Sequence, residues 1–300
     1  MSSQERAPRV KKPDWLKLPR AGGAVYAHTS AAIHKLGLAT VCEEARCPNR
    51  GECWGEGTAT VMILGDVCTR NCRFCSVGSG EPQPVDTDEP RRVAEAVKQL
   101  NLKYVVLTSV DRDDLPDYGA AHFAAVVGAI KTLSPDILVE VLTPDFQGHS
   151  HLVAQVAGSG VSVFGHNVEV PRRLTKLARD RRCSFDTSLS VLRVAKRMYP
   201  HVLTKSSLML GLGETEEEIL DTLKELHENG VDMVTLGQYL QPGRPQMEVE
   251  KYYSPDEFAD LEEKARTIGF TFVAAGPHVR SSYRAGELFV QGHLAAKKAE

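Results

Sequence analysis

The sequence lacks three features that would each assign it to a broad class of proteins. It has no excess of basic charge, because 36 Lys and Arg stand against 39 Asp and Glu, and general nucleic-acid binding requires a basic surface. No window approaches the roughly 20 apolar residues of a membrane helix, and residues 1–20 lack the apolar core of a secretory signal. We therefore expect a soluble, cytoplasmic protein that binds neither nucleic acid nor membrane.

Cysteine is scarce but unevenly placed. The chain has 7 cysteines in 300 residues, an odd number in a chain too long to be a small disulfide-stapled domain. Six of them form two groups, Cys42, Cys47 and Cys53 (the N-terminal triad) and Cys68, Cys72 and Cys75. Grouped thiols in a reducing compartment indicate metal ligation. Cys183 fits neither group, and we expect an ordinary buried thiol there.

The second group lies in one short stretch, residues 68–75, which we name the thiol loop. Three soft thiolates so placed can hold three irons of a four-iron cluster and leave the fourth iron open for chemistry. The alternative is that the cysteines, at i, i+4 and i+7, merely pack along one helix face. The polar neighbours Arg70, Asn71 and Arg73 disfavour that alternative.

The N-terminal triad has wider spacing, with Pro48 and Gly51 available to turn the chain between ligands. Its spacings differ from the Cys-x-x-Cys knuckles of common zinc modules, so a metal site other than zinc is favoured. Zinc and buried, inert thiols remain open as alternatives.

Hydrophobic periodicity predicts strands and helices in alternation. Expected strands lie at 59–64, 104–108, 137–142, 161–164, 203–210 and 233–236, and helices fall between them. Such alternation implies a parallel sheet with right-handed crossovers. We predict an α/β fold, a partial (β/α)6 TIM-type barrel with N- and C-terminal extensions. The expected divisions are an arm and triad-bearing extension at 1–57, the barrel at 58–245 and a C-terminal extension at 246–300.

Two further details are predicted for the extensions. A helix at 27–36 is expected, capped by Thr29 or Ser30. A capped helix at 254–269 leads into residues 270–274 and then to Ser281, so the final segment is expected to fold back to the N-terminal triad.

Polar residues collect where the predicted strands end. The second strand ends in Thr108 and Ser109, followed by an acidic loop up to residue 114 that suits substrate recognition or is simply solvated. The fourth ends in residues 166–169, where Asn167 and Glu169 suit either ribose hydroxyls or loop capping. We expect His166 to be a satisfied, partly buried histidine and not a metal ligand.

Here the motifs carry a resemblance to a known family. Cys68-x-x-x-Cys72-x-Phe74-Cys75 resembles the cluster motif of radical S-adenosylmethionine enzymes. Cys42-x4-Cys47-x5-Cys53, together with Arg280-Ser281-Ser282-Tyr283, is similar to the auxiliary-cluster signature of lipoyl synthases. The arm around Lys12 and Trp15 and the strand ends up to Pro242 extend the likeness over nearly the whole chain.

The resemblance implies a reaction and its cofactors. Family members insert two sulfurs at C6 and C8 of an octanoyl chain carried on a lysine, using two 4Fe-4S clusters and S-adenosyl-L-methionine. Unactivated C–H bonds offer no acidic proton to a general base, which makes a radical initiator necessary. The implied partners are an octanoylated lipoyl carrier (the glycine cleavage H protein or the E2 component of a 2-oxoacid dehydrogenase), an electron donor and an iron-sulfur cluster carrier.

The resemblance also assigns residues. Cys68, Cys72 and Cys75 would hold the cluster that cleaves S-adenosylmethionine. Cys42, Cys47, Cys53 and Ser281 would hold the auxiliary cluster that donates sulfur. By chemistry alone Ser282 would serve as well as Ser281, and both have the alternative of being ordinary turn hydroxyls. Contacts to the nucleoside and methionine are implied for Phe74, Thr108, Ser109, Asn167, Glu169, Met209 and Gly211.

Two positions depart from the family pattern. Tyr118 precedes Gly119 where family members usually have a glycine pair, and Gln246 stands where they commonly have a histidine. The sequence assigns no role to these two positions or to the arm, and it does not predict an oligomeric state.

Overall fold

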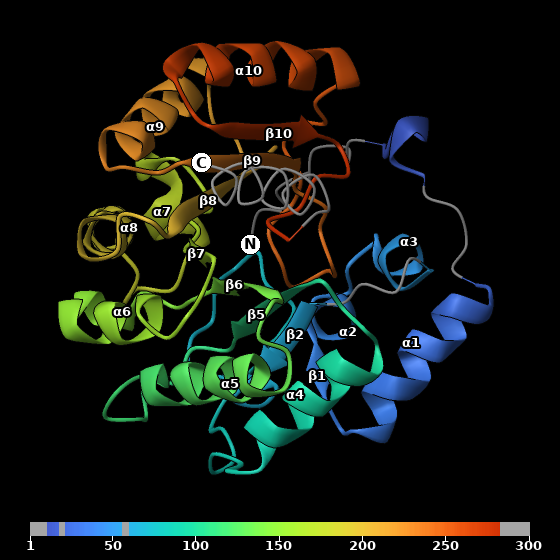
Figure 1. Cartoon of the computed structure of the whole chain (residues 1–300). Coiled ribbons are helices and arrows are strands. Elements are labelled where there is room, and N and C mark those ends of the chain that lie inside the picture. Colours follow the sequence, from blue (N-terminus) through green and yellow to red (C-terminus); the bar gives the residue numbers. More distant parts are fainter. Residues whose placement is uncertain (1–10, 18–21, 56–59, 283–300) are drawn as a thin grey trace, which may run out of the picture.

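A computed structural model describes residues 11–17, 22–55 and 60–282. Tyr283 of the motif at 280–283 lies outside the described residues. The main sheet has eight strands in the order β1-β2-β5-β6-β7-β8-β9-β10 (Figure 1). The strands are β1 (Ala39–Thr40), β2 (Thr60–Ile63), β5 (Tyr104–Ser109), β6 (Leu138–Leu142), β7 (Val163–Gly165), β8 (Leu203–Leu210), β9 (Met233–Gln238) and β10 (Phe272–Gly276).

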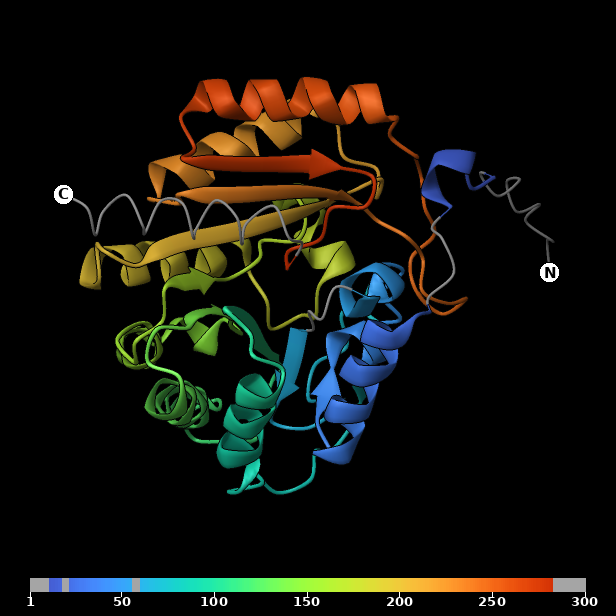
Figure 2. The same ribbon diagram turned by 45° about the vertical axis from the view of Figure 1, so that its right-hand side comes forward.

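All six predicted strands are confirmed, and they run parallel from β2 to β9. The sequence analysis missed how the extensions enlarge the sheet. β1 adds an antiparallel strand beside β2, and β10 adds a seventh parallel strand beside β9. The barrel stays open between these edges, with β10 and α10 (Pro255–Ile268) at one end and β1 with α1 (Ala24–Lys35) at the other (Figure 2).

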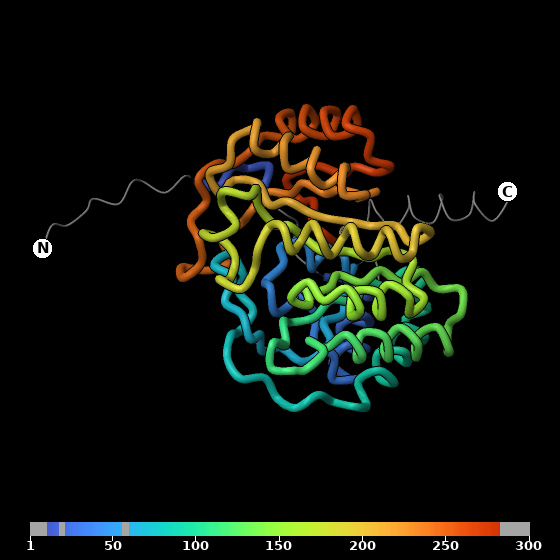
Figure 3. Tube along the Cα trace, turned by 90° about the vertical axis from the view of Figure 1, so that its left-hand side faces the viewer, coloured from blue at the N-terminus to red at the C-terminus, as the bar shows by residue number. Residues whose placement is uncertain are grey.

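The crossover helices cover the outer face of the curled sheet. They are α4 (Glu89–Gln99), α5 (Ala120–Leu133), α6 (Ser150–Ala157), α7 (Arg172–Ala178), α8 (Phe185–Met198) and α9 (Glu216–Glu228). Contacts between α4 and α5, α5 and α6, and α6 and α8 make a continuous layer (Figure 3). This arrangement leaves the carboxyl ends of the strands free of helices, so the loops that follow the strands can form a site.

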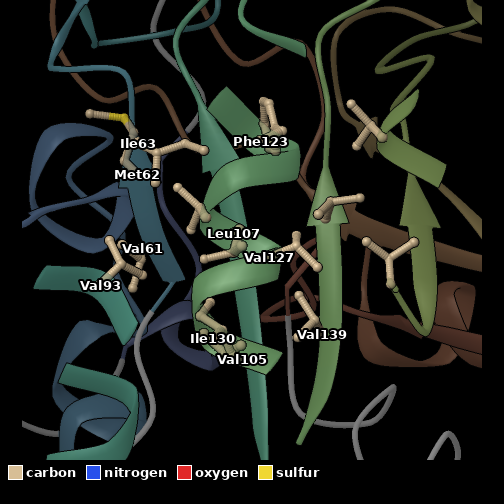
Figure 4. Close-up of a cluster of buried hydrophobic side chains, with 14 of the residues drawn as sticks. Val61, Met62, Ile63, Val93, Val105, Leu107, Phe123, Val127, Ile130 and Val139 are labelled. Atoms are coloured by element: carbon tan, nitrogen blue, oxygen red, sulfur yellow. The ribbon is translucent and has the colours of Figure 1, made fainter. Parts of the chain in front are cut away.

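The core lies between this helical layer and the sheet. Val105 and Leu107 of β5 face Phe123, Val127 and Ile130 of α5, and all five are essentially inaccessible to solvent (Figure 4). β-branched side chains fit such a pleated, fully buried surface. Burying a large apolar side chain contributes about 1.5–3 kcal/mol, so this packing fixes the strands that carry the site.

Local sequence signals set the ends of the last two helices. α9 begins with a capping box between Thr215 and Glu218, and α10 with one between Ser254 and Glu257. These reciprocal bonds satisfy N–H groups that a helix start leaves without partners. α10 ends at Gly269, whose φ of 116° suits glycine.

Other local predictions were wrong. Neither Thr29 nor Ser30 caps a helix, because α1 begins at Ala24 and its N-cap is Gly23. Thr29 lies mid-helix and donates its hydroxyl to the carbonyls of Val25 and Trp54. Three short helices were also missed, α2 (Val41–Glu44), α3 (Arg50–Gly55) and α7. Short helices like these depend on tertiary packing more than on a periodic pattern.

The return of the C-terminal segment, residues 277–282, to the N-terminal triad is confirmed. The Asn49 side chain, between Cys47 and Cys53, donates to the His278 carbonyl at 2.6 Å. The His278 ring lies 2.9 Å from the carbonyl of Trp15 in the arm. Three segments far apart in the chain therefore meet at the mouth of the barrel.

Within the part of the chain that the structure describes, no helix has the length and apolar character that a membrane span requires.

Candidate functional site

A cavity of about 530 Å³ opens at the carboxyl ends of the strands, within the usual size of a small-molecule site. It brings together most residues that the sequence analysis selected. Those lining it are Cys47, Cys68, Cys72, Cys75, Ser281, Phe74, Thr108, Ser109, Asn167, Glu169 and Met209. Cys42, Cys53 and Gly211 are not among its lining residues.

The thiol loop follows β2 and presents its three sulfurs as hydrogen-bond acceptors. The Cys68 sulfur accepts the backbone N–H groups of Arg70 at 3.4 Å and Asp111 at 3.3 Å. The Cys72 sulfur accepts from Asp180 at 3.3 Å, and the Cys75 sulfur from Val77 at 3.5 Å. Backbone donors aimed at sulfur favour thiolates and are typical of iron-sulfur ligands.

Arg70 fixes the middle of the thiol loop. Its side chain is 2% exposed and binds Asp145 through both terminal nitrogens, at 2.7 and 2.8 Å, and Asp113 at 2.8 Å. Burial opposes the charge of Arg70, yet these hydrogen bonds raise its pKa, while the same contacts lower the pKa of Asp145 against its burial. A buried charge is stable only when so paired. The clamp therefore ties the loop to the ends of β5 and β6.

The acidic loop after β5 has a structural role, whereas the sequence analysis expected either substrate recognition or simple solvation. Asp113 pairs with Arg70 and Asp114 with Arg112. Thr69 donates to the carbonyl of Asp111 and to the carboxylate of Asp113. The acidic loop thus anchors the thiol loop, and Asp113 and Asp114 form ion pairs with arginines.

Burial raises the pKa of several of these thiols. It raises the pKa of Cys68 to about 12, with the Asp111 charge adding to the effect. Burial also raises the pKa of Cys75 and Cys42. A coordinated cation deprotonates such a thiol outright, so ligand binding and proton release are coupled here.

Cys183 is buried, as expected, but it also lines the cavity, which the sequence did not indicate. Its thiol contacts that of Cys72, and this contact raises the pKa of Cys72. The contact, assisted by the charges of Arg179 and Arg70, lowers the pKa of Cys183 to about 7. A fourth thiol thus lies beside the three of the thiol loop.

The N-terminal triad spans two short helices. Cys42 lies in α2, only 6% exposed, in the core cluster against which Cys53 of α3 packs. Cys47 lies between the helices and faces the cavity, and its proximity adds to the effect of burial in raising the pKa of Cys42. Of the three triad cysteines, Cys47 is therefore the one that lines the cavity.

Ser281 reaches the cavity because β9 carries a glycine. A Cβ on Gly237 would lie 2.1 Å from the Val279 carbonyl, so only glycine permits this approach of the C-terminal segment. Arg280 is partly exposed, but loss of solvent around its guanidinium lowers its pKa, and it lies near Cys47. Ser281 and Ser282 both line the cavity.

The candidate contacts for S-adenosylmethionine differ in their bonding. The Ser109 hydroxyl is buried with no hydrogen-bond partner among the described residues, and such a group needs a partner. The Asn167 amide donates to Glu169 at 3.1 Å, and burial raises the pKa of Glu169. Asn167 and Glu169 both line the cavity, where a polar ligand could form further hydrogen bonds with their side chains.

His166 is a satisfied histidine, as expected. It is buried, its ring nitrogens lie 2.8 Å from the Thr143 carbonyl and 2.9 Å from the Ser188 hydroxyl, and burial lowers its pKa to about 4. Arg179, which the sequence analysis did not select, binds the same Ser188 hydroxyl and lines the cavity. No local motif marks Arg179; only the fold brings it there.

The structure shows what surrounds Gly211 and the two positions that depart from the family pattern, Tyr118 and Gln246. A Cβ on Gly211 would lie 2.3 Å from the Lys251 carbonyl, so the glycine admits a neighbouring chain. Tyr118 has φ of 53°, a region that favours glycine, so the glycine expected from the family pattern would fit this turn. Gln246 donates to the Cys75 carbonyl at 3.1 Å and so contacts the thiol loop.

The donor sets are dominated by thiols, and their geometry is not that of a single-ion site. Among residues 11–17, 22–55 and 60–282, no three His, Cys, Asp or Glu side chains converge as ligands of one metal ion would. A structural zinc site draws four ligands to about 2.0–2.3 Å from one ion. The three thiols of the thiol loop are soft ligands of the kind that iron-sulfur clusters take.

Comparisons with known proteins identify the family. Residues 62–226 match the model of the radical SAM superfamily. The chain is 56% identical to lipoyl synthase of Halorhodospira halophila over 280 residues, covering 93% of this chain and 84% of that protein. It is 51% identical to lipoyl synthase of Anaeromyxobacter sp. over 289 residues, covering 96% and 98%. It is 52% identical to mitochondrial lipoyl synthase of Danio rerio over 303 residues, covering 99% and 76%.

Solved structures agree on the fold. Methylornithine synthase is 14% identical with a TM-score of 0.51, covering 85% of this chain and 84% of that one. The hydrogenase maturase HydG is 13% identical with a TM-score of 0.54, covering 72% and 56%. These likenesses show a shared barrel-like architecture. The predicted resemblance is confirmed by the sequence relatives: this chain belongs to the lipoyl synthase family of the radical SAM superfamily.

Proposed function

We propose that this protein inserts two sulfur atoms, at C6 and C8, into an octanoyl chain attached to a lysine of a carrier protein, which yields the lipoyl group. One observation carries the proposal: a single cavity is lined by all three thiols of the thiol loop, by Cys47 of the N-terminal triad and by Ser281. A radical generator and a sulfur source must both reach one substrate chain, and a shared cavity permits this.

In this proposal Cys68, Cys72 and Cys75 hold a 4Fe-4S cluster whose open iron binds S-adenosyl-L-methionine. When bound, the cluster supplies the electron that cleaves S-adenosylmethionine and so initiates radical chemistry. The backbone N–H groups on the three sulfurs support the thiolate state, and the Arg70 clamp keeps the loop in place. Ser109, Asn167 and Glu169 orient the nucleoside and methionine from the cavity wall.

The N-terminal triad and Ser281 hold the second 4Fe-4S cluster, which is consumed as the sulfur substrate. Three soft thiolates and one harder oxygen make Ser281 the weakest of the four ligands. The iron next to Ser281 is then the easiest to release. Arg280, adjacent to Ser281 in the chain and close to Cys47, places a positive charge beside this ligand set.

The octanoyl chain enters the same cavity. Val41, Met62, Leu142 and Leu240 contribute apolar lining, which suits an unactivated hydrocarbon. The octanoyl hydrocarbon has no acidic or basic group, so the residues around it need only exclude water and fix its position.

We further propose the partners that this chemistry requires. They are an octanoylated carrier (the glycine cleavage H protein or the E2 component of a 2-oxoacid dehydrogenase), an electron donor and an iron-sulfur cluster carrier. Residues 1–57, 58–245 and 246–300 remain the proposed divisions. Some relatives, such as that of Danio rerio, are named as mitochondrial, whereas the name of the Halorhodospira halophila relative gives no compartment. A cytoplasmic location therefore stays a prediction.

Two measurements test the function. Iron, sulfide and zinc are first assayed in anaerobically purified protein; two 4Fe-4S clusters per chain are expected, and colourless protein with stoichiometric zinc and no sulfide would refute the proposal. The reduced protein is then given S-adenosylmethionine and an octanoyl-lysyl peptide. Singly and doubly thiolated peptides are expected by mass. Deoxyadenosine without either product would instead indicate a radical enzyme with another substrate.

A further inference from the structure

The mouth of the cavity has a charge of its own. Among the described residues that line the cavity, the exposed charged ones are Lys12 of the arm and Arg46, which follows α2, and both are basic. The acids that line it are Asp111, Asp145 and Glu169, and none of the three is exposed. The whole chain has more acids than bases, 39 against 36, so the basic mouth does not follow from the overall composition.

A third basic residue extends this group. The turn at 243–246 lies beside Arg46, because a Cβ on Gly243 would be 3.6 Å from the Nη1 atom of Arg46. Arg244 belongs to this turn and is exposed. We name Lys12, Arg46 and Arg244 the basic rim. None of these three side chains has an ion pair or a hydrogen bond within the part of the chain that the structure describes.

The segments that carry the basic rim are held against the body of the protein. In the arm, Leu16 is only 1% exposed, and the Trp15 carbonyl lies 2.9 Å from the His278 ring. In the turn at 243–246, the Gln246 side chain donates to the Cys75 carbonyl at 3.1 Å. The charges of the rim therefore stand at fixed places around the mouth and not on a free tail.

Arg46 adds an independent observation, because its backbone is strained. Its φ is 49°, a region that costs energy for any residue with a side chain. No bond from its own chain offsets this cost, since the acids of the neighbouring segments have other partners: Asp14 pairs with Lys17 at 2.5 Å and Glu43 with Arg50 at 3.4 Å. A strained, exposed and unpaired arginine at the edge of a site indicates a role in binding.

We propose that the basic rim docks an acidic face of the carrier protein, next to its octanoyl-lysine. The inference rests on the proposed function and deepens it, because an octanoyl chain attached to a protein enters the cavity only if the body of that protein rests on the mouth. The hydrocarbon itself gives basic residues nothing to bind. Opposite charges across such a contact speed association and select the partner, and salt weakens them.

The test compares two substrates of one site. The holoenzyme receives either octanoylated glycine cleavage H protein or an octanoyl-lysyl peptide without acidic residues, with dithionite as reductant, and the substrate concentration for half-maximal sulfur insertion is measured. We expect Lys12→Glu, Arg46→Glu and Arg244→Glu each to raise this concentration roughly 3- to 10-fold for the carrier, and by less for the peptide. Lys103→Glu is the matched control, because Lys103 is exposed and precedes β5, at the opposite end of the barrel. It should change neither value.

A binding measurement without turnover supports the same test. The affinity for fluorescently labelled carrier, followed by anisotropy, should fall with added salt in the unchanged protein and depend less on salt in the variant with all three substitutions. Arg46→Gly removes the charge and relieves the backbone, so it replaces Arg46→Glu if that variant loads no clusters.

Four outcomes would count against the proposals. Equal changes for carrier and peptide would overturn the docking role, and so would unchanged carrier binding in the variant with all three substitutions. A defect that appears only when a protein electron donor replaces dithionite would assign the basic rim to that donor and overturn the inference. Absence of thiolated product from both substrates in the unchanged protein would overturn the proposed function itself, which is a distinct failure.

Discussion

The two thiol sets of this protein are built in opposite ways. The thiol loop gathers its three cysteines within residues 68–75, and each sulfur accepts a backbone N–H from a nearby or adjoining loop. The N-terminal triad and Ser281 come from segments more than 220 residues apart. A hydrogen bond from Asn49 to His278, which are 229 residues apart in the chain, helps to join these segments. One set is local and the other is assembled by the fold.

This difference extends to what holds each set in place. Arg70 binds the thiol loop with buried charge pairs to Asp113 and Asp145, and breaking such a pair typically costs about 3–5 kcal/mol. The C-terminal segment depends on close backbone approach at Gly237 and on single hydrogen bonds, each contributing about 0.5–1.5 kcal/mol. The assembled set should therefore be the easier one to disturb without unfolding the protein.

The largest expected effect is that of Cys72→Ala. Loss of one ligand of the thiol loop should abolish deoxyadenosine formation and, with it, all thiolated product, because the radical precedes sulfur insertion. Both products are quantified by mass spectrometry after incubation with dithionite. Retained cleavage would contradict the role of the loop.

Cys47→Ala should separate the two sets. Sulfur insertion is expected to fall to background, while deoxyadenosine still forms, because Cys47 belongs to the assembled set alone. The same assay reports both. An equal loss of cleavage in Cys47→Ala and Cys72→Ala would refute the division of labour.

Ser281→Ala is expected to reduce thiolated product by about 10- to 100-fold, with a smaller effect on cleavage, because a cluster that loses its fourth ligand is bound less well. Ser282→Ala is the matched control, since both hydroxyls line the cavity. Full product yield from the Ser281 variant, or an equal loss in the Ser282 variant, would show that Ser281 has no special role.

Gly237→Ala tests the assembled set without removing a ligand. The added Cβ would lie 2.1 Å from the Val279 carbonyl, so the C-terminal segment must move and sulfur insertion should fall about tenfold, while cleavage is largely kept. Gly128→Ala in α5 is the control, because nothing lies within 4 Å of its Cβ. It should leave both activities unchanged and stabilise the helix by about 0.5–1 kcal/mol. Unchanged insertion in Gly237→Ala would contradict the close approach.

The smallest effect concerns a contact between the two sets. The Ser76 hydroxyl, next to the thiol loop, donates to the Glu44 carbonyl beside the N-terminal triad at 2.9 Å. Ser76→Ala should lower the free energy of unfolding by about 1 kcal/mol, measured by urea denaturation, and leave the ratio of thiolated product to deoxyadenosine nearly unchanged. A large change in that ratio would mean that the sets are coupled through this contact.

The sequence predicted the parallel strands and the thiol loop because both have local signals: apolar runs such as residues 203–210, and a short cysteine motif. It did not reveal β10 as a sheet strand or Arg179 as a cavity residue, since each depends on packing between distant segments. The acidic loop shows the same limit, because only the fold places Asp113 against Arg70. The family resemblance, and not the local pattern, selected Ser281, while Cys183 was placed beside Cys72 by the structure alone.

The most direct test of the central claim follows the origin of the inserted sulfur. The protein is reconstituted with heavy-isotope sulfide, freed of excess sulfide, and given S-adenosylmethionine, reductant and an octanoyl-lysyl peptide for a single turnover in buffer containing light sulfide. If the N-terminal triad and Ser281 hold the sulfur substrate, both sulfurs of the product should be heavy. Product containing light sulfur from the buffer would contradict the account.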